Sequence, residues 1–382
     1  MTSSRDIIIL GASARAAAFS ALRAGLRPWC ADLFADQDLQ TRCSNRRVPF
    51  GVYPKALEAI AESGPPGPWM YTGGLENHPA LILRISAKRV LWGNKGTGLA
   101  LARRPLFLEE IFQSNGICFP KSFTSSDRLP QTGRWLSKPL RGAGGAGIHF
   151  VSSRQDSDSA EHAYSQQFIE GIPCSAVFAG FESDARLLGA TRQLVGERWL
   201  HARAFHYCGS IGPLKLDPVV KITLEKIGNL VQRYCCLRGL FGVDFILADR
   251  IPWPVEINPR YTASVEILEY ALGIQALSWH RSAFDRAMPM DALIEGDSVV
   301  GKAIMFAQSE MEFPPEGPWT GTLTHSKLVE EMPGFADIPA PGHRVQAGRP
   351  ILTFFSKSSS VHGCIDSLKQ IARDLDHCLW KT

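Results

Sequence analysis

Several common signatures are missing from this sequence of 382 residues. It has no CxxC pair, no HExxH run and no other cysteine or histidine spacing that zinc sites use. The signature GxGxxG is absent too, because Gly11 is followed by Ala12 and Ser13, which argues against a dinucleotide site. No segment reaches the ~18 apolar residues of a membrane span. The apolar run in the first residues, MTSSRDIIILGAS, is too short for a signal peptide and predicts a strand.

Basic and acidic residues nearly balance in this sequence. The net charge of +4 is small for this length and there is no long basic block, so the composition predicts no nucleic-acid partner. The nine cysteines are scattered, apart from the adjacent Cys235 and Cys236, which predicts free thiols in a reducing cytoplasm. With 45% apolar and 20% charged residues the chain should be globular, and its length suits two or three domains.

The order of predicted elements indicates an α/β protein in three parts. Residues 6–32 are typical of a strand, a helix and a strand, a βαβ unit of Rossmann type that opens a first domain at 1–90. A second domain at 91–300 begins with a helix predicted over 96–116. The remaining part, 301–382, is rich in predicted strands and turns and ends in a helix.

A glycine-rich loop follows a lysine in the second domain. In WLSKPLRGAGGAGIHFV, residues 135–151, Lys138 ends a predicted strand, and four glycines follow it: Gly142, Gly144, Gly145 and Gly147. Glycines let the backbone turn its N–H groups into an anion-binding concavity, and a lysine beside them adds a charge for phosphate. A flexible hairpin turn is the alternative, although four glycines are more than a two-residue turn requires.

The stretch GVDFILADRIPWPVEINPR, residues 242–260, carries polar residues at regular offsets. If GVDFIL and VEINP are strands joined through ADRIPWP, Glu256 and Asn258 share one face, with Asp244 across the hairpin. Oxygen ligands gathered on one sheet face are what a Mg²⁺ ion bound to phosphates needs. The alternative is a half-buried hairpin whose polar residues face water, which leaves Arg260 unexplained.

The order of these features resembles the ATP-grasp superfamily over roughly residues 90–300. Lys95 stands before a helix, SKPLRGAGGAGI and QQFIEG follow, and the D…E-x-N-x-R series closes the region. The resemblance implies an ATP-grasp fold with a Rossmann-like preATP-grasp domain at 1–90 and a small strand-rich C-terminal domain at 301–382. It also implies a lid at about 118–165.

The resemblance implies roles for matching positions. Lys95, Lys138 and the loop glycines would contact the phosphates of ATP, and the adenine hinge would be formed by Gln167, Phe168, Ile169 and Glu170. The ligands of Mg²⁺ or Mn²⁺ would be Asp244, Glu256 and Asn258, and Arg260 would be catalytic. One departure is Pro173, which stands where many members carry a ribose-binding glutamate.

By this resemblance the protein is a cytoplasmic, ADP-forming ligase that joins a carboxylate to an amine through an acyl phosphate. A faint similarity to proteins of pterin-linked one-carbon metabolism suggests a pathway. The partners would be small-molecule substrates, with no membrane or nucleic acid, and a homodimer is allowed. Candidate substrate residues are Tyr71, Glu76 and Asn77, which would follow a strand of the first domain.

Two alternatives stay open. One is a carboxylase like biotin carboxylase that uses carboxyphosphate, although its catalytic glutamate matches Glu266 only with a spacing two residues too long. The other is an ATP-binding protein without turnover, which the intact set of Asp, Glu, Asn and Lys residues disfavours.

Overall fold

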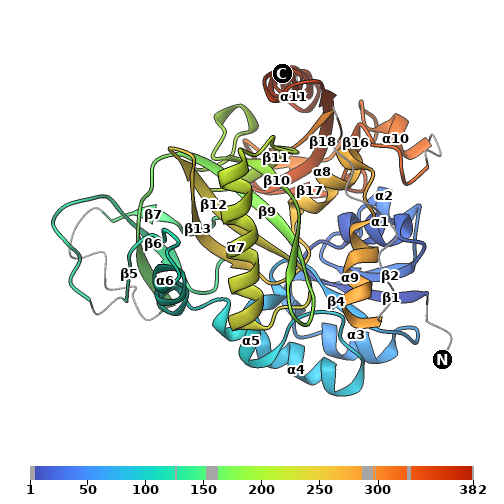
Figure 1. Cartoon of the computed structure of the whole chain (residues 1–382). Coiled ribbons are helices and arrows are strands. Elements are labelled where there is room, and N and C mark those ends of the chain that lie inside the picture. The colour runs from blue at the N-terminus through green and yellow to red at the C-terminus, as the bar shows by residue number, and fades with distance from the viewer. Residues whose placement is uncertain are drawn as a thin grey trace.

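The computed structural model describes residues 5–124, 127–151, 162–285, 296, 298–324 and 328–380. A large body carries a smaller sheet that projects from one side, on the left of Figure 1. The segment predicted as the lid, about 118–165, covers this projection, although its residues 125–126 and 152–161 lie outside the described residues. The mixed α/β architecture that the sequence predicts is confirmed.

A parallel sheet forms the N-terminal part. Its strands lie in the order β3-β2-β1-β4: β3 (Asn45–Arg47), β2 (Arg27–Asp32), β1 (Asp6–Leu10) and β4 (Trp69–Tyr71). The helices of this part are α1 (Arg15–Arg23), α2 (Gln37–Gln40), α3 (Leu57–Ser63) and α4 (Pro79–Lys88). The apolar run of β1 is buried, as a strand covered on both faces requires. Loops after β1, β2 and β4 leave the sheet at its carboxyl edge, where α/β proteins bind ligands.

The single helix predicted over 96–116 is wrong. The structure has two helices, α5 (Gly96–Leu101) and α6 (Pro105–Ser114), with a break between them. Pro105 explains the break, because proline lacks an N–H group and pushes the preceding residue out of the helical region. Arg104 indeed has φ −107° and ψ 100°. The break matters for function because it turns Arg103 toward the pocket described below.

The projecting sheet holds the lysine and the glycine loop. Its order is β5-β8-β6-β7, with strands β5 (Ser122–Thr124), β8 (Ala163–Gln167), β6 (Trp135–Pro139) and β7 (His149–Phe150). The pairs of this sheet are antiparallel. The glycine loop joins β6 to β7, as the sequence predicts, and Lys138 lies at the end of β6.

The main sheet has eight antiparallel strands in the order β13-β12-β9-β10-β11-β14-β18-β16. Their bounds are β9 (Ile172–Gly180), β10 (Ala185–Val195), β11 (Tyr207–Gly212), β12 (Gly239–Ala248), β13 (Ile251–Asn258), β14 (Val299–Phe306), β16 (Phe335–Ala336) and β18 (Pro350–Ser358). The strands predicted in the C-terminal part therefore extend the same sheet. The division of the chain at residues 90 and 300 stays a prediction.

Helix α7 (Pro218–Cys235) covers one face of this sheet (Figure 1). Its apolar residues pack on Phe178 and Phe241, whose rings stack at 5.1 Å. The close approach needs Gly228, because a Cβ there would lie 2.4 Å from the ring of Phe178. Burial of this apolar surface fixes the sheet that carries the site.

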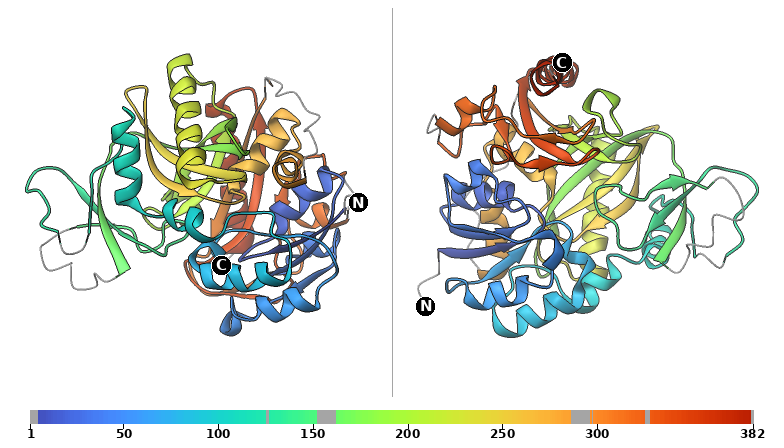
Figure 2. Two further views of the ribbon diagram at one scale, coloured as in Figure 1. Left: turned by 60° about the horizontal axis from the view of Figure 1, so that its bottom comes forward. Right: turned by 180° about the vertical axis from the view of Figure 1, so that it is seen from behind.

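Four further helices and a small ribbon complete the body (Figure 2). Helices α8 (Ala263–Leu272) and α9 (Ala276–Asp285) lie between the main sheet and α1, and α11 (Val361–Leu379) packs on β14 and β18. The others are α10 (Thr320–Thr324) and the ribbon of β15 (Met311–Glu312) and β17 (Arg344–Val345). Within the described residues, no helix is both long and apolar enough to cross a membrane.

The predicted hairpin is present, but its turn is shorter than the sequence suggested. Strand β12 runs to Ala248 and β13 starts at Ile251, so only Asp249 and Arg250 turn, with φ of 48° and 64°. Two positive φ values match the twist of a two-residue hairpin. The prolines in IPWP lie within β13, which is tolerated because β13 is an edge strand.

A buried ionic network joins the three parts of the chain. Arg15 on α1 contacts Glu266 on α8 and Asp337 in the C-terminal part, and Lys302 on β14 lies 3.1 Å from Glu266. Burial alone would raise the pKa of Glu266, but the charges of Arg15 and Lys302 outweigh it and lower this pKa. The network therefore fixes how the first domain sits against the main sheet.

We expect Glu266→Ala to lower the free energy of unfolding by about 3–5 kcal/mol, because it removes the carboxylate that pairs with buried Lys302 and one of the carboxylates that pair with buried Arg15. Glu58→Ala, at the solvent-exposed pair with Arg84, should cost far less because water screens that pair. Because folding lowers the pKa of Glu266, its contribution is lost as the pH falls below its ordinary value of 4.5. Urea unfolding at neutral and acidic pH measures both effects, and equal losses in the two variants would contradict this role.

Candidate active site

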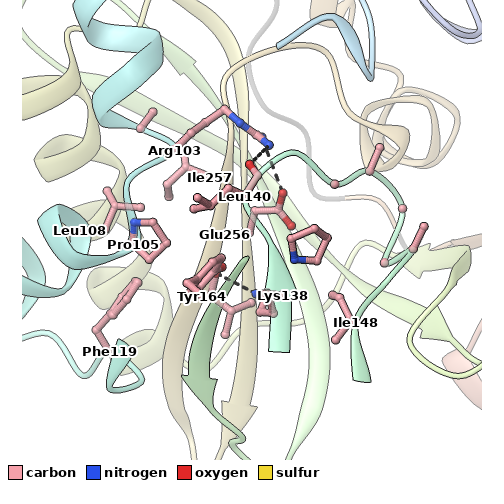
Figure 3. Close-up of a pocket in the computed structure, with 18 residues that line it drawn as sticks. Arg103, Pro105, Leu108, Phe119, Lys138, Leu140, Ile148, Tyr164, Glu256 and Ile257 are labelled. Carbon is pink, nitrogen blue, oxygen red and sulfur yellow. Dashed lines mark hydrogen bonds and ion pairs between the residues drawn. The ribbon is translucent and has the colours of Figure 1, made fainter. Parts of the chain in front are cut away.

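A small pocket lies between the projecting sheet, the main sheet and the break between α5 and α6 (Figure 3). Its walls include Arg103 from the helix break, Lys138 and Tyr164 from the projecting sheet, and Glu256 from β13. The glycine loop closes one side through residues 142–146. The cavity has about 60 Å³, well below the roughly 300–1,000 Å³ of pockets that hold a small-molecule ligand. A larger ligand therefore requires the glycine loop to move.

The hairpin brings the three predicted metal ligands together. Asp244 on β12 pairs with Glu256 on β13, and Asn258 Nδ2 donates to Asp244 Oδ2 at 2.9 Å. Burial, and then the charge of Glu256, raise the pKa of Asp244 to about 6. Two like charges side by side on one sheet face favour a bound cation.

The ligand set is sparse for a protein-only metal site. Within the described residues, no group of three or more His, Cys, Asp or Glu side chains could hold a metal ion. A divalent cation would therefore bind two carboxylates and the Asn258 amide oxygen, and take its other ligands from water or a phosphate. Such a set fits Mg²⁺, which keeps several waters and binds through few carboxylates.

Lys138 enters the pocket from the projecting sheet, opposite the hairpin of β12 and β13. Its Nζ donates to Gln166 Oε1 at 3.0 Å and lies 3.4 Å from the Val255 carbonyl oxygen on β13. Burial alone would lower the pKa of Lys138, but Tyr164 and Glu256 outweigh it and raise this pKa. The lysine is therefore charged and faces β13, the strand of the predicted metal ligands Glu256 and Asn258, called the metal strand from here on.

Arg103 is the cation that the sequence analysis missed. Its guanidinium lies 3.8 Å from Glu256 and donates to the Leu140 carbonyl oxygen at 3.3 Å (Figure 3). It also donates to Asn77 Oδ1 at 2.8 Å. The signal in the sequence was Pro105, which ends one helix and starts another two residues after Arg103. Because the sequence analysis predicted one continuous helix over 96–116, it did not identify Arg103 as a pocket residue.

Lys95, the other predicted phosphate-binding lysine, lies outside this pocket. It precedes α5, its side chain is exposed, and it does not line the pocket that Arg103 and Lys138 share. Its predicted contact with a nucleotide therefore has no support from the arrangement of this pocket.

The predicted adenine hinge joins β8 to β9, outside the pocket lining. The Gln167 and Phe168 amides donate to Lys121 and Arg134 carbonyl oxygens, both at 2.8 Å. Glu170 is exposed. A hinge role for Gln167, Phe168, Ile169 and Glu170 stays a prediction.

The glycine loop is closed over the pocket. The Gly144 carbonyl oxygen accepts from the Tyr207 amide at 3.0 Å, and the Gly142 carbonyl oxygen accepts from Asn77 Nδ2 at 3.2 Å. Gly145 has φ +80°, and a Cβ there would lie 1.8 Å from the Phe205 carbonyl oxygen. Only glycine allows this closed position.

Arg260 lies between the metal strand and the first domain. Its Nε donates to Glu76 at 2.8 Å, its Nη2 to Asn258 Oδ1 at 3.0 Å and its Nη1 to the Tyr261 carbonyl oxygen at 3.0 Å. Its acidic partner is thus Glu76, neither Glu256 nor Glu266.

The end of β4 and the loop after it carry the candidate substrate residues Tyr71, Glu76 and Asn77. Asn77 contacts both Arg103 and the glycine loop, as described above. Tyr71 is buried, and its hydroxyl donates to the Asn94 carbonyl oxygen at 2.7 Å, so it supports the fold.

Comparison with known proteins identifies the fold. A family model described as an ATP-grasp domain matches residues 106–264. No curated protein matches the sequence. Among solved structures, an L-amino acid ligase from Bacillus licheniformis aligns with a TM-score of 0.72 and 15% identity over 98% of each chain.

Two further structures are similar. The biotin carboxylase domain of 2-oxoglutarate carboxylase from Hydrogenobacter thermophilus, in complex with MgADP and bicarbonate, gives a TM-score of 0.72 at 12% identity, over 94% of this chain and 88% of that one. An N5-carboxyaminoimidazole ribonucleotide synthetase from Thermus thermophilus gives 0.68 at 14% identity, over 96% and 98%. The chain therefore carries an ATP-grasp domain and has the fold of the ATP-grasp superfamily.

We expect Mg²⁺ to raise the melting temperature of the wild-type protein and to leave that of Glu256→Gln nearly unchanged. The substitution removes one of two carboxylate ligands, and it also relieves the repulsion that raises the pKa of Asp244, so the variant should fold normally. Because Asp244 must be ionised to bind a cation, the wild-type shift should fade as the pH falls below about 6. Thermal unfolding with and without Mg²⁺ measures this, and equal shifts in both proteins would remove Glu256 from the metal site.

Proposed function

We propose that the protein is an ATP-dependent ligase that joins a carboxylate to an amine through an acyl phosphate. The observation that carries the proposal is the meeting of Arg103, Lys138 and Glu256 at one pocket, with Asp244 paired to Glu256 across the hairpin. Two cations with a divalent-metal ligand set are suited to the triphosphate of MgATP. The MgADP bound to the similar carboxylase domain supports the same choice of ligand.

The residues of the pocket have separate tasks in this proposal. Arg103 and Lys138 hold phosphate oxygens from opposite sides, and the amides of the glycine loop close over them. Asp244, Glu256 and Asn258 hold Mg²⁺, which would neutralise charge on the phosphates. The closed loop excludes water, which would otherwise hydrolyse an acyl phosphate.

Arg260 is the residue that we assign to the acyl phosphate. Its contact with Asn258 places it beside the metal strand, and its contact with Glu76 places it at the carboxyl edge of the first-domain sheet. A guanidinium can hold a carboxylate or phosphate through two hydrogen bonds. The substrate acid would therefore bind between the two domains.

The carboxylase alternative is less well supported. It needs a glutamate base, and the nearest match in the sequence, Glu266, is fully buried between Arg15 and Lys302. This carboxylate is part of the network between domains and does not line the pocket. A binding protein without turnover would not need a complete set of metal ligands beside Arg260.

We further propose a cytoplasmic location, since all nine cysteines are free thiols. A place in pterin-linked one-carbon metabolism and a homodimer stay predictions from the sequence resemblance.

We expect Arg103→Ala to weaken MgATP binding by roughly 10- to 150-fold, the effect of losing charge-assisted hydrogen bonds of about 1.5–3 kcal/mol. Lys95→Ala is the matched control, and it should change the affinity by less than about threefold because its side chain lies outside the pocket. Calorimetric titration with a non-hydrolysable ATP analogue and Mg²⁺ measures both. A larger loss from Lys95→Ala would restore the prediction made from the sequence.

The reaction itself is tested by a screen of carboxylic acids and amines for ADP release, followed by mass spectrometry of the product. The proposal expects a product with the mass of acid plus amine minus water, formed with one ADP. ADP released with bicarbonate as the only acid, together with a carboxylated product, would favour the carboxylase instead.

A further inference from the structure

Glu76 carries a buried carboxylate oxygen that has no hydrogen-bond donor among the described residues, called the open oxygen below. The residue lies in the short helical turn Leu75–Asn77 after β4 and is only 3% exposed. One oxygen, Oε1, accepts from Arg260 Nε at 2.8 Å. The other, Oε2, is buried and has no hydrogen-bond partner within the described part of the chain. A buried carboxylate oxygen without a donor is costly, so its retention indicates a ligand that supplies one.

Tyr53 presents a second open group next to the same turn. Its hydroxyl is buried and, among the described residues, has no partner either. A Cβ on Gly74, two residues before Glu76, would lie 3.4 Å from this hydroxyl oxygen. Burial, and then the charges of Glu76 and Asp32, raise the pKa of Tyr53, so the hydroxyl stays neutral and its oxygen can accept a hydrogen bond.

The position of these groups relates them to the reaction centre. Arg260 joins Glu76 to Asn258 of the metal strand through two of its nitrogens. The next residue, Asn77, contacts Arg103 and the glycine loop. The open oxygen is therefore one side chain away from the place assigned to the acyl phosphate, on the side of the first domain.

We propose that Glu76 Oε2 and the Tyr53 hydroxyl bind the amine substrate in its ammonium form, and that Glu76 then removes one of its protons. This inference rests on the proposed ligase function and specifies its second substrate as a primary amine that is cationic at neutral pH. Two acceptors in a buried site suit an ammonium group. Once Glu76 has taken the proton that it binds, the lone pair lies along that N–H direction, and rotation about the C–N bond of the amine turns it toward the acyl carbon.

The step balances in protons and charge. Glu76 takes one proton from the ammonium group and later returns it to solvent. The freed lone pair forms the C–N bond to the acyl carbon, and the bond from that carbon to the phosphate oxygen breaks. The second proton lost from nitrogen leaves with the phosphate as hydrogen phosphate.

The test compares hydroxylamine with amines that are protonated at neutral pH. Hydroxylamine is largely unprotonated at neutral pH and traps an acyl phosphate as a hydroxamate without needing a base. Each reaction contains the protein, MgATP and one acid from a panel of the twenty amino acids and simple dicarboxylates. In one arm the amine is hydroxylamine. In the other arm it is glycine, ethanolamine or another amino acid. Amide and hydroxamate are quantified by mass spectrometry.

We expect Glu76→Gln to lower the ratio of amide to hydroxamate by about 10²-fold or more, the scale of a lost general base. Glutamine keeps an oxygen for Arg260, so the change is confined to the open atom. The amide rate of this variant should also rise with pH more steeply than that of the wild type, because free amine must then come from solution. Tyr53→Phe should raise KM for the amine about tenfold, and Glu58→Gln on the domain surface is the control.

The outcomes separate this inference from the proposed function. Hydroxamate from the wild type together with an unchanged ratio in both variants contradicts the inference and leaves the ligase function supported. A parallel loss of both products in Glu76→Gln shows that Glu76 acts only through Arg260, which also contradicts it. If the wild type forms no hydroxamate with any acid, the proposed function fails, and the inference fails with it.

Discussion

Two carboxylates placed side by side at the edge of the main sheet are the constraint on which the site depends. Asp244 and Glu256 face each other across the hairpin of β12 and β13, and their repulsion contributes to the raised pKa of Asp244. Three cations interact with this negative charge: Arg103 from the helix break, Lys138 from the projecting sheet and Arg260 just after β13. Each comes from a different part of the chain, so the charge of the hairpin organises the contact between those parts.

The loop after β4 contacts both Arg260 and the glycine loop. Glu76 contacts Arg260, and Asn77 contacts Arg103 and the glycine loop. A single turn of the first domain therefore touches two of the three cations and the loop that closes the pocket. The network around Arg15 and Glu266 fixes the first domain on the main sheet, and Leu75 anchors the turn in the core of that domain.

Local patterns in the sequence were enough to predict the elements that carry the site. The glycine loop after Lys138 and the hairpin with Asp244, Glu256 and Asn258 are each set by residues close together in the chain, where strand alternation and glycine content have direct meaning. The ATP-grasp fold followed from the order of these motifs, and the comparisons confirm it. Proline explains most of the errors: Pro105 breaks a helix that apolar periodicity alone extends, and Pro252 and Pro254 fit a strand only because that strand is at the edge.

Contacts between distant segments could not be predicted. The pairing of Arg260 with Glu76 spans 184 residues, and that of Arg15 with Glu266 spans 251. No periodicity or spacing encodes such pairs, because they depend on how separate domains pack. For the same reason the sequence analysis did not find Arg103, whose place in the pocket depends on the break between α5 and α6.

The most direct measurement is a crystal structure of the protein with Mg²⁺ and a non-hydrolysable ATP analogue. The account predicts the phosphates between Arg103 and Lys138 under the glycine loop, with the metal on Asp244, Glu256 and Asn258. Phosphates bound away from this pocket, or a metal held without the hairpin carboxylates, would contradict it.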